Sequence, residues 1–270
     1  MSDAAAVVGL GDLGISIARR LHEVGVLVTG IDGAPERREL WEGETRLSAL
    51  ASTAELDPAS APRAFVCVRT TEQADAVIAD LNGRLGPDAV LYVVTTLAVD
   101  FARGLGERAA ADGPRLVELP VSGGRGGAER GELIVLAGGP AARPEDIAFL
   151  ERTLASQVLP MRRYGEATLA KLLNNALAAY NALAFGSAVE LAADAGLDVG
   201  STAELLRRGS GGSWMADAFA DLVDDLLAKD AALLAAELGP LPTIDLSDPA
   251  ALPPALARAR ELLGDELLEN

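Results

Sequence analysis

The chain has 270 residues, half of them hydrophobic, and its formal net charge is −17. This length allows one large domain or two modest ones, each with a buried core. The acidic balance disfavours nucleic acids and anionic membrane surfaces as partners, because both select basic surfaces, and the single cysteine excludes an internal disulfide.

The first part of the chain alternates apolar, strand-like runs with amphipathic, helix-like stretches. Strands are predicted at residues 4–9, 26–31, 64–68, 89–94, 115–119, 132–137 and 157–161. Helices are predicted between several of them, at 13–23, 71–82, 97–111 and 144–156. This alternation is typical of an α/β protein with a mostly parallel, doubly wound sheet of the Rossmann type, covered by helices on both faces.

Beyond Tyr164 the pattern changes, and no further strand is predicted. The stretch 169–195 is rich in alanine and leucine and predicts one long helix. Further helices are predicted at 202–208, 214–229 and 252–263, with a proline-rich, irregular segment at 238–254. We therefore expect a Rossmann-type domain at 1–163 and an all-α domain at 164–270.

The N-terminus lacks the basic start and the long apolar run of a signal peptide. The richest apolar stretch, 172–193, is interrupted by three asparagines and a glutamate, which disfavours a membrane span. We therefore expect a cytoplasmic protein without a membrane partner.

A glycine-rich segment, Gly9-Leu10-Gly11-Asp12-Leu13-Gly14, follows the first predicted strand and opens the first predicted helix. This context indicates a dinucleotide-binding turn. Gly9 permits the tight turn, Gly11 lets the backbone approach a pyrophosphate, and Gly14 lets helix and strand pack closely. The free N–H groups at the start of the helix would bind the phosphates.

Asp32 ends the second predicted strand, 18 residues after Gly14. A carboxylate at this place binds the adenosine ribose hydroxyls and repels a 2′-phosphate, so NAD is favoured over NADP. Arg37 and Arg38 follow shortly afterwards and are the opposing evidence, which leaves NADP as the alternative. Surface arginines at a helix start are, however, more often simply solvated.

The lysines are few: only Lys171 and Lys229 occur, and arginine supplies the other basic residues. Arginine stays protonated near neutral pH, so a general base must come from another residue type. Lys171 and Asn175 are four residues apart and therefore lie on one helix face. An asparagine inside a helix requires a polar partner, and beside this rare lysine we favour a ligand site over helix packing.

Ser122-Gly123-Gly124 follows the fifth predicted strand and could expose successive N–H groups to an anion. Taken alone, this segment is better interpreted as an ordinary glycine turn. The single histidine, His22, lies on the first predicted helix and receives no role, and no metal site is expected.

Together these motifs resemble the 3-hydroxyisobutyrate dehydrogenase and β-hydroxyacid dehydrogenase family. The matching stretches, in order, are 9–14, 120–124 with 127–128 and 131, 171–175, 209–214 and 229–230. Thr95-Thr96 also resembles the Ser-Thr segment that lies beside the nicotinamide in this family. Five motifs in the right order are far more specific than any one of them.

The resemblance implies that Lys171 is the general acid/base on the substrate hydroxyl or carbonyl, and that Asn175 holds the substrate and orients Lys171. It implies substrate binding by Ser122, Gly123, Gly124 and Trp214. It implies cofactor contacts by Thr96 and by Lys229, which would close the site from the helical half. Burial beside a cationic nicotinamide would lower the pKa of the lysine enough for it to accept a proton.

The function expected is NAD-dependent interconversion of a small 3-hydroxy acid and its semialdehyde or keto form. Two alternatives stay open: an imine reductase-like enzyme, which usually lacks the lysine, and a non-catalytic NAD(P)-binding protein. The chain departs from the family at Glu118, where aspartate is usual, at Ala167, where glycine is usual, and in its shorter segment between Trp214 and Lys229. The family pairs its long central helix across a two-fold axis, so we expect a homodimer.

Overall fold

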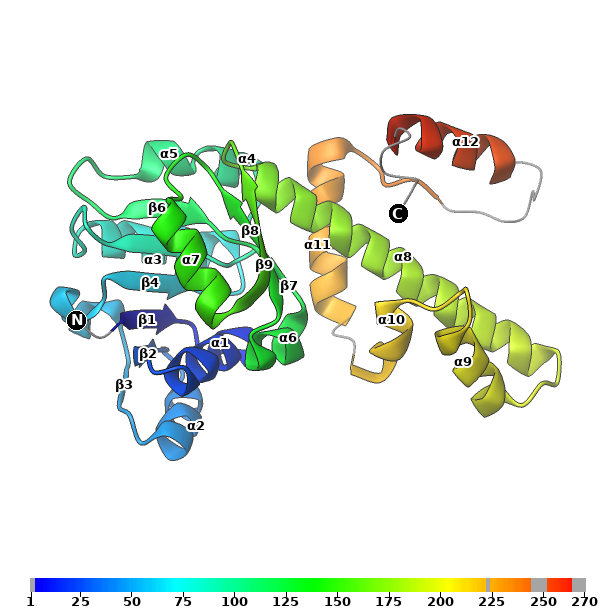
Figure 1. Cartoon of the computed structure of the whole chain (residues 1–270), viewed down its shortest axis with the longest axis horizontal. Helices are drawn as coiled ribbons and strands as arrows, with labels where there is room; N and C mark the ends of the chain where they lie inside the picture. The colour runs from blue at the N-terminus through cyan, green and yellow to red at the C-terminus, as the bar shows by residue number, and fades with distance from the viewer. Residues whose placement is uncertain (1–2, 222–223, 244–251, 264–270) are drawn as a thin grey trace. The chain divides into compact units, whose positions relative to one another are not determined.

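The computed structural model of the chain describes residues 3–221, 224–243 and 252–263. By its internal contacts the chain divides after Gly239 into two compact units. The second unit contributes one helix to the described residues, α12 (Leu252–Leu263). All other elements belong to the first unit (Figure 1).

The described residues form one sheet of nine strands. Its strands are β1 (Ala4–Val8), β2 (Leu27–Ile31), β3 (Ala49–Leu50), β4 (Arg63–Val66), β5 (Val90–Val93), β6 (Arg115–Glu118), β7 (Val121–Ser122), β8 (Leu133–Gly138) and β9 (Ala155–Met161). Their order is β3-β2-β1-β4-β5-β6-β8-β7, and β9 pairs with β8. The strands from β3 to β6 are parallel, whereas β8 runs antiparallel to β6 and β7. The predicted doubly wound, mostly parallel sheet is therefore confirmed.

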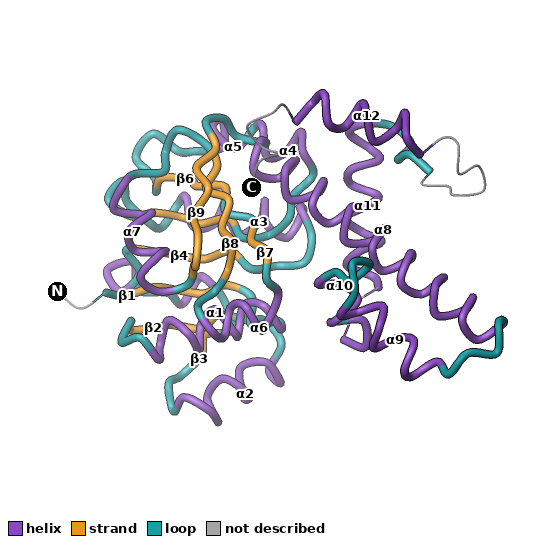
Figure 2. The backbone as a smooth tube through the Cα atoms, turned by 45° about the vertical axis from the view of Figure 1, so that its right-hand side comes forward, coloured by secondary structure: helices purple, strands orange, loops and turns teal. Residues whose placement is uncertain are grey.

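The sheet is covered on both faces by helices, as Figure 2 shows. The helices of this part are α1 (Asp12–Glu23), α2 (Pro35–Thr45), α3 (Thr71–Asn82), α4 (Val99–Arg103), α5 (Leu105–Arg108), α6 (Gly124–Arg130) and α7 (Pro144–Thr153). Side chains alternate across a strand, so Ala5 and Val7 of β1 enter one apolar core while Ala6 and Val8 enter the other. Helices α1, α6 and α7 contribute to the first core, and α3, α4 and α5 to the second.

Parts of this region differ from the sequence-based expectation. For helix α2 only a start near Arg37 and Arg38 was expected and no bounds were predicted, because among its side chains only Trp41 is fully buried and the rest give no apolar periodicity. Helix α6 begins in a glycine-rich segment that reads as a turn. The single helix expected at 97–111 is in fact α4 and α5, which Gly104 separates.

After β9 the described residues are helical. The elements are α8 (Glu166–Asp194), α9 (Val199–Arg208), α10 (Trp214–Asp217), the 3₁₀ turn η3 (Phe219–Asp221) and α11 (Asp224–Leu238). The long helix α8 was expected, but the continuous helix predicted at 214–229 is wrong. The chain turns there because Phe219 packs against Phe185 of α8, with ring centroids 5.0 Å apart, and both α10 and α11 contact α8.

A buried carboxylate fixes the start of α8 to the sheet. Glu118, the last residue of β6, is fully buried and accepts hydrogen bonds from the N–H groups of Gly165 (2.7 Å) and Thr168 (2.6 Å). Gly165 is the N-cap residue of α8 and cannot supply a side-chain acceptor itself. Burial raises the pKa of Glu118, while the hydrogen bonds from Thr168 and Gly165 oppose that shift.

We predict that Glu118→Gln destabilises the protein. The carboxamide keeps one acceptor oxygen but turns an N–H₂ group toward the second backbone donor, which leaves buried groups unsatisfied at a cost of about 1–3 kcal/mol. Glu118→Asp should lose less, because it keeps the charge and only shortens the reach. Urea denaturation measures the free energy of unfolding, and an unchanged value for Glu118→Gln would contradict this account of the helix start.

Candidate active site

The turn between β1 and α1 has the shape that a dinucleotide requires. Gly9 has a φ of +94°, and a Cβ on it would collide with the carbonyl oxygen of Cys67. A Cβ on Gly14 would collide with the carbonyl oxygen of Gly9. Gly11 differs, because a Cβ there would meet nothing within 4 Å. The turn is therefore closed toward the sheet and open above Gly11, where a pyrophosphate needs access to the backbone.

Helix α1 begins at Asp12, and no side chain caps it at Gly11. The N–H groups of its first turn have no partner inside the helix, so they are suited to phosphate oxygens. Asp12 does not cap the helix. Its carboxylate instead accepts a hydrogen bond from Arg37 Nη1 of α2 at 3.0 Å.

Asp32 lies just beyond β2 and joins the turn to the end of that strand. Its Oδ2 accepts from the N–H of Leu10 at 2.7 Å, and its Oδ1 accepts from the N–H of Ala34 at 2.8 Å. Each carboxylate oxygen has a second lone pair that could accept from a ribose hydroxyl. The residues present thus fit both the phosphate and the ribose parts of a dinucleotide.

The loops after β4 and β5 are joined by Thr95. Its buried hydroxyl accepts from the N–H of Val68 at 3.0 Å and lies 3.0 Å from the carbonyl oxygen of the same residue. Its neighbour Thr96 is half-buried, and no described residue hydrogen-bonds to the Thr96 side chain. Thr95 therefore holds the two loops together, and Thr96 is the threonine with a hydroxyl left for a ligand.

Lys171 lies in the second turn of α8 and is partly buried. Burial lowers the pKa of Lys171 to about 8; the negative charge of Asp230 opposes this shift, and the positive charge of Lys229 adds to it. Within the described part of the chain, the Lys171 ammonium group makes no hydrogen bond and no ion pair. It is therefore an amine that changes protonation near neutral pH.

A polar cluster lies near this amine where α11 packs on α8. Asn175 Nδ2 donates to Asp230 Oδ2 at 2.6 Å, and Asn174 Nδ2 donates to Asn175 Oδ1 at 3.2 Å. Lys229 Nζ lies 3.3 Å from Asp230 Oδ1, which accepts no hydrogen bond from a described residue. Asp230 is only 4% exposed, so its charge acts where water screens it little.

The sequence alone did not give Asp230 a role, although it follows Lys229 in a matching stretch. A carboxylate inside an otherwise alanine- and leucine-rich helix was the available signal, since a buried charge requires partners. The partners themselves could not be read from the sequence, because Asn175 is 55 residues away.

A series of contacts connects this cluster with the glycine turn. Lys229 Nζ donates to the carbonyl oxygen of Arg69 at 3.4 Å, in the loop that follows β4. Cys67, two residues earlier, lies against Gly9. At the far end of α11, Glu237 pairs with Arg103 of α4 at 2.6 Å. The structure thus brings Lys171, Asn175 and Lys229 together and joins them to the loops beside the nucleotide turn.

Ser122, Gly123 and Trp214 meet in a separate cavity. Its other lining residues are Gly127, Arg130, Glu132 and Ile134. Trp214 is 64% exposed, so its ring is free to cover a ligand. Gly124 is the first residue of α6 and faces open space. Lys171 does not line this cavity, so the predicted catalytic residues and the predicted substrate-binding residues form two groups rather than one.

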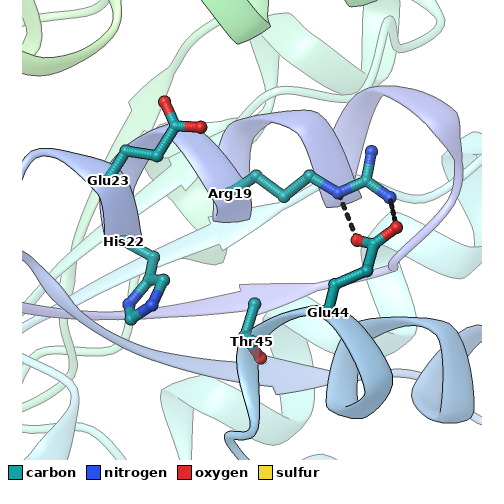
Figure 3. Close-up of a pocket in the computed structure, with 5 residues that line it drawn as sticks. All are labelled: Arg19, His22, Glu23, Glu44 and Thr45. Atoms are coloured by element: carbon teal, nitrogen blue, oxygen red, sulfur yellow. Dashed lines mark hydrogen bonds and ion pairs between the residues drawn. The ribbon is translucent and has the colours of Figure 1, made fainter.

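A further cavity lies between α1 and α2, lined by Arg19, His22, Glu23, Glu44 and Thr45 (Figure 3). None of the residues predicted to bind cofactor or substrate lines it. Among the described ranges, no group of three or more histidine, cysteine, aspartate or glutamate side chains is arranged to hold a metal ion.

Comparison with known proteins gives two family matches that together span most of the chain. The NAD binding domain of 6-phosphogluconate dehydrogenase matches residues 4–161. The domain described as NAD-binding of NADP-dependent 3-hydroxyisobutyrate dehydrogenase matches residues 165–232.

Individual relatives agree with these matches. L-threonate dehydrogenase of Cupriavidus necator is 29% identical and covers 85% of this chain and 77% of its own length. The 3-hydroxyisobutyrate dehydrogenase of Pseudomonas aeruginosa is 29% identical over 77% of this chain and 70% of its own length. The crystal structure of 3-hydroxyisobutyrate dehydrogenase from Salmonella typhimurium superposes with a TM-score of 0.79, at 26% identity, over 89% of this chain and 90% of that one.

The first family match alone covers more than half of the 270 residues, and its glycine turn is the one described above. The second covers the helices that carry the lysine cluster. The chain therefore belongs to the NAD(P)-dependent β-hydroxyacid dehydrogenase family.

Proposed function

We propose that this protein interconverts a small 3-hydroxy acid and its semialdehyde or keto form, with NAD as cofactor and Lys171 as the general acid/base. The observation that carries the proposal is the lowered pKa of Lys171, about 8, on an amine without an ion-pair partner among the described residues. A group with a pKa near the working pH can both accept and donate a proton.

The bound nicotinamide supplies the hydride acceptor in oxidation and the hydride donor in reduction. In oxidation, the neutral Lys171 amine accepts the proton of the substrate hydroxyl. In reduction, the Lys171 ammonium donates a proton to the carbonyl oxygen. The hydride and the proton thus leave the same C–O group in oxidation and join it in reduction. The protein has to accept or donate only the proton.

Asn175 is suited to hold the substrate oxygen beside Lys171. Its carboxamide is oriented at both ends, by Asp230 and by Asn174, so its direction is set before a substrate binds. Asp230 also balances the charge of Lys229. We propose that Asp230 keeps the lysine cluster close to neutral, so that the pKa of Lys171 does not fall too far to donate.

For the substrate carboxylate we propose Ser122 and the N–H groups of Gly123 and Gly124, with Trp214 covering the bound acid. Their support is the cavity that Ser122, Gly123 and Trp214 line together. NAD is proposed over NADP because Asp32 holds its charge at the end of β2, tied there by two backbone N–H groups. Thr96 and Lys229 would contact the cofactor from the loops beyond.

We propose that residues 1–163 bind the nucleotide and residues 164–270 provide substrate and subunit contacts, in a homodimer formed through α8. By length and composition alone α8 could also span a membrane, but it packs against α9, α10 and α11. Its exposed large side chains are Leu173, Leu177, Leu183 and Leu191. A helix that is apolar on nearly all sides needs cover, which a second copy of α8 would provide.

Replacing Lys171 tests the chemistry. Lys171→Met keeps the volume and removes the amine, so turnover of 3-hydroxy acids should fall about 10²- to 10⁴-fold, the usual contribution of a general acid/base. NADH binding, followed by fluorescence, should change little. The control is Glu190→Gln at an exposed position of the same helix. Turnover that survives in Lys171→Met would exclude Lys171 as the proton carrier.

The pH dependence gives a second test. Oxidation needs the neutral amine, so kcat/KM for oxidation should rise with pH through about 8, and reduction should fall over the same interval. Asp230→Asn removes the charge that raises the pKa of Lys171, so both curves should move to lower pH. Glu190→Gln should leave them in place. A shift to higher pH in Asp230→Asn would show that the electrostatic assignment is wrong.

The homodimer has its own test. Light scattering should give twice the mass of one chain, and Leu177→Glu with Leu183→Glu should give a folded monomer, because the introduced charges cannot be buried between two copies. Retained far-UV circular dichroism serves as the control for folding. A wild-type monomer at working concentration would remove this part of the proposal.

A further inference from the structure

We propose that Asp12 is a second residue that selects NAD over NADP, because its carboxylate withholds Arg37 from a 2′-phosphate. The inference rests on the proposed use of NAD and concerns the adenosine end of the site, where the structure offers two guanidinium groups beside Asp32.

The guanidinium of Arg38 hydrogen-bonds to the backbone. Its Nη1 donates to the carbonyl oxygen of Asp32 at 2.7 Å and to that of Gly33 at 2.9 Å. These two bonds satisfy carbonyls at the end of β2 and direct the guanidinium along the chain. Arg38 therefore has a structural use in closing the loop before α2.

Arg37 is the cation that remains, and Asp12 binds it. The Nη1–Oδ1 distance is 3.0 Å, and the side chains of Arg37 and Asp12 are 40% and 75% exposed. The pair bridges the first turns of α2 and α1, directly beside Gly11 of the nucleotide turn. The charge of Arg37 is therefore balanced by a carboxylate of the protein itself and not by a phosphate of the cofactor.

Asp12 acts against a 2′-phosphate in two ways. It occupies the guanidinium that would otherwise be the natural partner of a phosphate, for which arginine has matching geometry. It also adds a second negative charge to that of Asp32, and like charges repel a phosphate dianion. NAD has a hydroxyl where NADP has the 2′-phosphate, so neither effect lowers the affinity for NAD.

The size of the effect follows from exposure. An exposed ion pair contributes little, so a phosphate could compete for Arg37. Asp12 therefore sets the ratio of the two affinities rather than excluding NADP. That ratio is what an experiment should measure.

The same two helices supply a matched control. Arg19 of α1 and Glu44 of α2 form a bidentate pair, with distances of 2.6 and 2.7 Å (Figure 3). Arg19 follows Asp12 by seven residues, which is about 10 Å along a helix. Glu44→Gln therefore removes one carboxylate from an arginine pair between α1 and α2 without touching the nucleotide turn.

The experiment is a titration of NADH and of NADPH, followed by nucleotide fluorescence at fixed low ionic strength. The variants are Asp12→Asn, Arg37→Gln, the double variant and Glu44→Gln. In Asp12→Asn the affinity for NADPH relative to NADH should rise about three- to tenfold, the range expected for freeing one exposed arginine and removing one nearby charge. The double variant should lose most of that gain, and Glu44→Gln should show none. Thermal melting confirms that each variant is folded.

Three outcomes overturn the proposal: an unchanged ratio in Asp12→Asn, an equal gain in the double variant, or an equal gain in Glu44→Gln. The second would show that Arg37 is not the group released, and the third that net charge alone acts. Failure of the proposed function looks different. Wild-type protein that binds NADPH more tightly than NADH, or that turns over no hydroxy acid, leaves the change in ratio measurable.

Discussion

The proposed site depends on keeping one amine poorly hydrated without giving it a direct counter-ion. A buried ammonium loses hydration, which favours its neutral form, whereas a carboxylate in contact would restore its charge. Asp230 is close enough to raise the pKa of Lys171, but its oxygens face Asn175 and Lys229 instead. Burial, the opposing charge of Asp230 and the charge of Lys229 together leave the pKa of Lys171 at about 8.

That balance requires α8 and α11 to be held firmly, and the fixing groups lie outside the cluster. Glu118, at the end of β6, binds the backbone N–H groups at the start of α8. The first of these donors, Gly165, lies six residues before Lys171. Arg103 holds the end of α11, and the carbonyl oxygen of Arg69 receives Lys229. Each is a polar contact between an element of the sheet region and a helix beyond it.

The sequence predicted the features that are decided by residues close together in the chain. The start of α3 follows from Thr70 and Gln73, which form a capping box. The glycine turn could be predicted because close backbone contacts require a glycine at Gly9 and at Gly14, while Gly11 leaves the turn open. Helix α2 has too little apolar periodicity for its bounds to be predicted, and the contact of Phe219 with Phe185 after α10 joins residues far apart in the sequence. The hydrogen-bond partners of Glu118 and Asp230 lie 47 to 55 residues away, so no short window of sequence contains them.

The net charge of the chain is −17, although the dinucleotide of its family and the proposed hydroxy acid are both anionic. We propose that backbone N–H groups at the start of α1 and beside Ser122 donate hydrogen bonds to these anions. Among the described residues, Arg37, Arg103 and Arg115 are each paired with a carboxylate of the chain. Backbone N–H donors are fixed in direction and few in number. They can therefore bind a pyrophosphate or a carboxylate, but they leave no donor for an additional phosphate. In the proposal for Asp12, a carboxylate contributes to selection because it pairs with an arginine that could otherwise bind an additional phosphate.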